Sequence, residues 1–188
     1  MPQNTPRGYT YPLYSDANSF PAQIQDMATD IDTDMDSLWD RVVVAYNQPA
    51  CRVRASGVNQ AVAANTDVTA TYAEEVYDNA GMFNLGVSTS IVNIVSTGLY
   101  IASARVSFLS NGNATINARQ ISIVSSGSLG IVGRRSHDGA QNIATAVAMT
   151  VAFWAASGTT LTVVQRQNSG ALLNTSTRQL MVARVGTL

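Results

Sequence analysis

The 188-residue sequence contains no lysine, one cysteine and one histidine, and only 12% of its residues are charged. That charged share is about half of what an average globular protein carries. A single cysteine excludes an intrachain disulfide and a cysteine-rich metal site. The net charge is −1 and the eleven arginines form no basic block, so the electrostatic signature of a nucleic-acid-binding protein is missing. We expect no nucleic-acid partner.

Long apolar runs are also missing, although 46% of the residues are apolar. No segment approaches the roughly 18 apolar residues of a membrane helix. The first residues lack the apolar stretch of a signal peptide. We therefore expect a soluble chain without a membrane partner, made in the cytoplasm, that reaches any position outside a cell by another route.

Residues 1–18 hold three of the five prolines, and proline removes backbone donors and blocks helix formation. This composition predicts an extended arm that becomes ordered against a partner. Aromatic side chains are enriched at protein interfaces, so three tyrosines are the candidate anchoring residues of the arm: Tyr9, Tyr11 and Tyr14.

Residues 19–46 predict one α-helix, with Ser19 as a possible cap and Pro21 near the start, where proline is tolerated. Apolar residues recur at alternating steps of four and three, which is the 3.5-residue repeat of a coiled coil. Such a short helix is marginal alone, so the stripe that these apolar residues form along it is expected either to be a trimer seam or to dock on the chain's own domain. The stripe comprises Ile24, Ala28, Ile31, Met35, Leu38, Val42 and Ala45.

The same segment carries alternating aspartates in TDIDTDMDSLWD (29–40), which raise the alternative of a calcium loop. An EF-hand loop that starts at Asp30 would need glycine where Met35 stands and glutamate where Arg41 stands. Acids two residues apart on a helix also point about 200° apart. The aspartates are therefore interpreted as the solvated side of the helix, and no metal is expected.

From residue 47 onward the pattern predicts β-structure, with 47–65 as a linker and first strand and 66–188 as a head domain. Apolar residues alternate with polar ones, and glycine, asparagine and serine separate the runs. SNGN (110–113) predicts a hairpin, and SSGSLGIVG (125–133) predicts another turn. Eight to ten strands without intervening helices indicate an antiparallel sandwich or barrel. One buried face is expected at Tyr100, Ala102, Ala104, Val106 and Phe108, and others at Val147, Met149, Val151 and Phe153 and at Leu161 and Val163.

No catalytic constellation is evident. His137 stands between Ser136 and Asp138, but catalytic triads converge from separate elements, and a polar turn fits SHDG better. Glu74 and Glu75 are adjacent on a predicted strand and so point to opposite faces. We expect no enzyme activity and no cofactor. The basic group Arg134, Arg135 and His137 is interpreted as a surface loop that either contacts an anionic glycan or another protein, or is simply solvated.

The order of motifs in the β-part resembles the trimeric jelly roll of the C1q/TNF-like superfamily. The resemblance covers roughly residues 66–188. It depends on VYDNAGMF (76–83), on STGLYIASARVSF (96–108) with its glycine–aromatic step at Gly98–Tyr100, and on SGTTLTVVQRQNSG (157–170). It implies a mainly β, antiparallel jelly-roll sandwich that forms homotrimers.

The opening TPRGYTYPLYSDANSFPAQIQDMATDID (5–32) is similar to the start of small minor tail or fibre proteins of tailed phages that infect actinobacteria. This resemblance implies a homotrimeric virion structural protein, located in the virion, with other virion proteins and a host cell-surface glycan as partners. Two alternatives stay open: a capsid decoration or head fibre protein that stabilises the shell, and a depolymerase of host polysaccharide.

Overall fold

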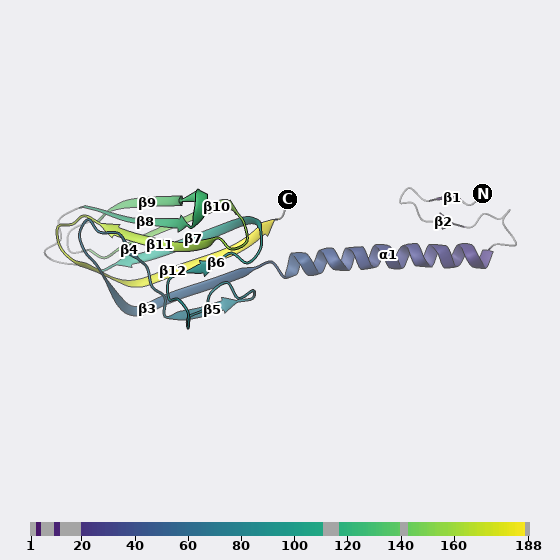
Figure 1. Cartoon of the computed structure of the whole chain (residues 1–188), viewed down its shortest axis with the longest axis horizontal. Coiled ribbons are helices and arrows are strands. Elements are labelled where there is room, and N and C mark those ends of the chain that lie inside the picture. Colours follow the sequence, from purple (N-terminus) through teal and green to yellow (C-terminus); the bar gives the residue numbers. More distant parts are fainter. Residues whose placement is uncertain (1–2, 5–9, 12–19, 111–116, 140–142, 187–188) are drawn as a thin grey trace. The chain divides into compact units, whose positions relative to one another are not determined.

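The computed structural model describes residues 3–4, 10–11, 20–110, 117–139 and 143–186. The chain divides into two compact units, Met1–Asn47 and Gln48–Leu188 (Figure 1). The first contains β1 (Gln3–Asn4), β2 (Thr10–Tyr11) and the helix α1 (Phe20–Tyr46), and β1 pairs antiparallel with β2. Within α1 the hydroxyls of Thr29 and Thr33 each donate to the carbonyl four residues earlier, so these polar side chains are satisfied by the helix itself.

The second unit is an antiparallel sandwich of two sheets (Figure 1). The first sheet has the order β10-β7-β12-β3-β5, and the second has the order β4-β11-β8-β9, with β6 paired to β11. The strands of the first sheet are β3 (Ala50–Val62), β5 (Glu74–Asp78), β7 (Gly98–Phe108), β10 (Thr145–Ala155) and β12 (Leu173–Gly186). Those of the second are β4 (Val68–Thr69), β6 (Val92–Asn93), β8 (Asn117–Ser125), β9 (Ile131–Gly139) and β11 (Thr160–Gln167). The predicted mainly β, antiparallel sandwich with one preceding helix is confirmed.

The core lies between the two sheets and is built from the faces that alternation predicts. Tyr100, Val106 and Phe108 of β7 are fully buried, and Phe153 of β10 stacks on Tyr100 with ring centroids 6.3 Å apart. Because successive strand residues face opposite sides, one apolar residue in two suffices to build such a core. The predicted inward faces of β7, β10 and β11 are confirmed.

Two sequence-based expectations about connections require correction. SNGN lies mostly outside the described residues, but the strands on either side of it, β7 and β8, belong to different sheets and do not form the expected hairpin. The head also begins earlier than residue 66. β3 lies between β12 and β5 in the first sheet, and only Asn47, Gln48 and Pro49 separate it from α1. By contrast, SSGSLGIVG does form the expected turn, with a short 3₁₀ helix η1 (Gly127–Leu129) and positive φ at Gly127 and Gly130.

A register shift in β12 reverses which residues face the core. The pairing of β12 with both β3 and β7 skips one residue between Thr175 and Thr177. As in any β-bulge, the extra residue changes the phase of the alternation. Thr175 and Arg178 therefore both point inward, and Arg178 lies opposite the buried Val106. This places an arginine in the sandwich interior.

Candidate self-association surface

The outward side of the first sheet carries a contiguous apolar surface. On β10, β7 and β12 the residues that alternate with the core positions are small or apolar over one half of the sheet. Trp154 pairs with Leu99, Ala152 pairs with Ile101, and Ile101 also pairs with Ala183. Directly opposed residues of neighbouring strands lie about 5 Å apart. These side chains therefore form one surface, here called the apolar patch: Leu99, Ile101, Ala152, Trp154, Met181 and Ala183.

The apolar patch is open to solvent in the single chain. Leu99 is 40% exposed and Trp154 is 38% exposed. Ile101 at the centre is flanked on both sides by alanines, whose small side chains would let another backbone approach it closely. Contiguous exposed apolar surface on a folded domain marks an interaction site more often than scattered apolar residues do.

Arginine and glutamine residues border the apolar patch along the same face. Arg105 of β7 pairs with Gln179 of β12, and Gln179 in turn pairs with Arg54 of β3. The side-chain oxygen of Gln179 accepts from Arg52 at 3.1 Å, and Arg54 forms an exposed bidentate ion pair with Glu74. This ion pair lowers the pKa of the Glu74 carboxyl. An apolar centre with a polar, charged border is the usual anatomy of a protein interface.

The helix presents a second exposed apolar surface. The side chains of α1 are described over 24–39, and there Ile24 is 42% exposed and Met35 is 60% exposed. Ala28, Ile31 and Leu38 are exposed as well. The side chain of Val42 lies outside the described residues. The role of this stripe as a trimer seam or docking face remains a prediction.

The remaining predicted contact residues are placed differently from expectation. The structure places Arg134, Arg135 and His137 in β9 and not in a loop. β9 is an edge strand that pairs with β8 along one side. Charged residues are tolerated there because one face and one edge of the strand meet solvent. The ring of His137 contacts the carbonyl of the neighbouring Asp138 at 2.7 Å. In the arm, Tyr9 and Tyr14 lie outside the described residues, and only the backbone of Tyr11, in β2, is described.

Two buried arginines were not predicted from the sequence. Arg178 is 1% exposed, and it donates to the carbonyls of Thr71, Val58 and Thr175 at 2.8–2.9 Å. Burial lowers its pKa, and burial raises that of the nearby Tyr72 hydroxyl. Arg119 of β8 is buried too and donates to the carbonyl of Ile143 and the hydroxyl of Thr145.

Two signals in the sequence could have revealed these arginines. Arg119 shares its alternation phase with Ile121 and Ile123, both fully buried. The buried residues of β12 change from odd positions (Leu173) to even ones (Leu180), which indicates a bulge between them. Both arginines satisfy backbone carbonyls, so we assign them to the stability of the head.

The described residues offer little metal-binding capacity. Within them, no three His, Cys, Asp or Glu side chains lie close enough together to hold an ion. Cys51 is buried in the core, and burial raises the pKa of its thiol to about 12. No helix among the described segments has the length and apolarity to cross a membrane.

Comparison with known proteins identifies the fold. No family model matches the sequence, and no curated protein is similar to it. The globular domain of zebrafish complement 1qA is similar in structure, with a TM-score of 0.55 and 11% identity over 75% of this chain and 99% of that chain. Murine APRIL at pH 5.0 gives a TM-score of 0.55 and 11% identity over 73% and 99%. Eiger TNF from S. frugiperda gives 0.50 and 11% over 74% and 95%. The head therefore has the C1q/TNF-like jelly-roll fold.

Proposed function

We propose that this chain is a homotrimeric structural protein of a phage virion. In this proposal it is a minor tail or fibre protein whose arm anchors it to the particle. The helix associates with its two copies, and the head is displayed for attachment to the host surface. The observation that carries the proposal is the apolar patch, which is exposed in the single chain and lies on the outward face of the first sheet.

Burial between copies of the head is the simplest use of the apolar patch. Its alanine-rich centre allows close approach, and apolar area removed from water contributes about 25 cal/mol per Å². The resemblance to the trimeric C1q/TNF-like superfamily implies three copies, and the 3.5-residue repeat of α1 is compatible with three helices associating along one seam.

The location on a phage particle is proposed from the resemblance of the opening, residues 5–32, to the start of minor tail and fibre proteins of tailed phages. A proline-rich arm in front of a coiled-coil stripe suits a protein that is fixed at one end and displayed at the other. Three identical heads on one particle would also multiply weak contacts with a repetitive host surface. No chemistry is required of the head in this role.

Sedimentation velocity of the purified full chain tests the oligomeric state, and we expect a species with three times the mass of the chain. Replacing Ile31 and Leu38 together with aspartate should weaken or abolish this species, because unpaired charges would be buried in the seam. A matched control adds the same two charges off the seam, as Thr33→Asp with Ser37→Asp. A stable monomer in the wild type would refute the proposal.

The virion location needs a separate test. Antibodies against the purified head, coupled to gold, should label the tail of intact particles in electron micrographs. Labelling confined to the capsid would contradict the tail assignment.

A further inference from the structure

The outer side of the second sheet differs in chemistry from the apolar patch. Its outward positions on β8, β9 and β11 include Gln120, Ser122, Ser136, Thr162 and Arg166. Two cross-strand contacts join such side chains: Arg134 donates to the hydroxyl of Ser122, and Ser136 donates to the side-chain oxygen of Gln120, each at 3.3 Å. If the first sheet faces other copies, the second sheet faces outward.

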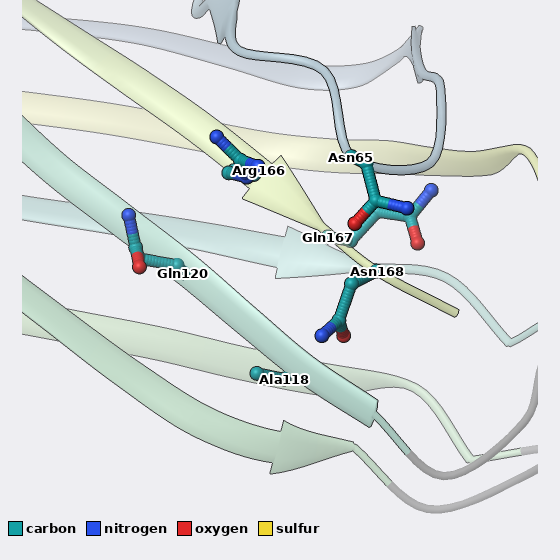
Figure 2. Close-up of a pocket in the computed structure, with 6 residues that line it drawn as sticks. All are labelled: Asn65, Ala118, Gln120, Arg166, Gln167 and Asn168. Carbon is teal, nitrogen blue, oxygen red and sulfur yellow. The ribbon is translucent and has the colours of Figure 1, made fainter. Parts of the chain in front are cut away.

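A small cavity of about 110 Å³ lies at the end of this polar side (Figure 2). Its walls come from β8, from the end of β11 and from the turn after β3, three segments far apart in the sequence. Four of its six lining residues carry side-chain amides, and the cavity also includes one guanidinium and one methyl group. The lining residues are Asn65, Ala118, Gln120, Arg166, Gln167 and Asn168.

Backbone hydrogen bonds hold the walls of this amide pocket together. The backbone N–H of Asn65 donates to the backbone carbonyl of Gln167 at 2.7 Å, and the backbone N–H of Asn168 donates to that of Ala118 at 3.3 Å. The buried Gln167 side chain donates to the carbonyls of Val62 and Ala171 and accepts from Ser169. The pocket is therefore pre-formed, which reduces the entropy lost when a ligand binds.

Two amides remain available to a ligand. Within the described part of the chain, the side chains of Asn65 and Asn168 have no hydrogen-bond partner, and both residues are exposed. Asn65 has φ of 58°, in the left-handed region that asparagine tolerates better than most residues. Each primary amide offers two donors and one acceptor. That combination matches hydroxyl groups, which both donate and accept.

The pocket fits other ligand classes poorly. Arg166 is the one cation among the described lining residues and is already paired with Asp67 at 3.2 Å, so a phosphate would find little free charge. Among the described residues that line it there is no aromatic ring, and the one apolar group is the methyl of Ala118. Strands β8 and β11 are each paired on both sides, which leaves no free edge for a peptide backbone. The volume lies below the roughly 300 Å³ of a drug-sized site.

We propose that the amide pocket binds one neutral sugar residue of a polysaccharide, with Asn65 and Asn168 as the hydrogen-bonding residues. The inference builds on the proposed display of a trimeric head, because one small polar pocket binds weakly and three on one particle gain avidity. In this proposal the glycan contacts the amide pocket, and not Arg134, Arg135 and His137 as expected from the sequence.

Saturation-transfer NMR of the full chain with glucose, galactose, mannose, N-acetylglucosamine, rhamnose and arabinose tests the inference. We expect transfer to at least one of these sugars. The double variant Asn65→Gly with Asn168→Ala should weaken its binding at least tenfold, and glycine preserves the left-handed backbone. Ala118→Leu, which fills the pocket and keeps both amides, should do the same. Asn59→Ala, which removes an exposed amide outside the pocket, should bind like the wild type.

No transfer to any of the six sugars overturns the inference, as does equal binding by wild type and both pocket variants. Sedimentation of the same samples distinguishes failure of the sugar-binding inference from failure of the proposed trimer. A trimer that binds no sugar refutes only the sugar site. A monomer whose sugar binding is lost in the pocket variants refutes only the trimer.

Discussion

Replacement of Trp154 by alanine tests the apolar patch directly. Trp154 is 38% exposed in the single chain and lies opposite Leu99 at one end of the patch. Its neighbours Phe153 and Ala155 point into the core, so the substitution changes the outward surface and leaves the core residues in place. The variant should fold and should self-associate less strongly than the wild type.

The size of the effect follows from the exposed area. A tryptophan side chain has up to about 250 Å² of surface, so a 38% exposed fraction leaves about 95 Å² to bury on assembly. At about 25 cal/mol per Å² this contributes about 2.4 kcal/mol per chain, or about 7 kcal/mol per trimer. Since about 1.4 kcal/mol corresponds to tenfold, the monomer–trimer constant should change by about 10⁵. The concentration at half-assembly varies as the square root of that constant and should rise about 300-fold.

Sedimentation velocity over a concentration series measures this shift. Val87→Ala is the control, because Val87 is 82% exposed and lies outside the apolar patch, so it should leave the half-assembly concentration unchanged. Circular dichroism of each variant checks that the head is folded. If Trp154→Ala assembles at the same concentration as the wild type, the patch is not the contact between copies.

Two further predictions concern the interior of the head. Arg178→Ala should reduce the free energy of unfolding by about 3–5 kcal/mol, because three carbonyls lose the buried guanidinium that donates to them. Arg166→Ala, which breaks an exposed ion pair, should reduce the free energy of unfolding by less than about 1 kcal/mol, and urea titration measures both variants. If both variants lost the same stability, burial of Arg178 would not be the cause of its larger effect. The pKa of the Cys51 thiol is raised from 9.0 to about 12 in the folded head, so the unfolded chain releases this proton first and stability should fall as pH rises above 9. The loss should reach about 1.4 kcal/mol near pH 10 and be smaller in Cys51→Ala; a urea midpoint that rises between pH 8 and 10 would refute it.

The sequence by itself determined the class of the fold. Residues such as Tyr100, Val106 and Phe108 alternate with polar ones, and a period of two is possible only on a strand with one buried face. The stripe from Ile24 to Leu38 predicts a helix for the same kind of reason, because local periodicity is fixed by local backbone geometry. Leu99 and Ile101 also share the outward phase of β7, so part of the apolar patch was visible in the sequence.

Only the tertiary structure decided how these elements are combined. SNGN looks like a hairpin, yet β7 and β8 join different sheets, because pairing depends on partners far away along the chain. Arg178 is buried because a single bulge in β12 reverses its alternation, and the amide pocket exists because Asn65 meets Asn168 across a strand end. Alternation fixes which residues share a face. What that face meets is set by packing between distant segments, and no local pattern carries that information.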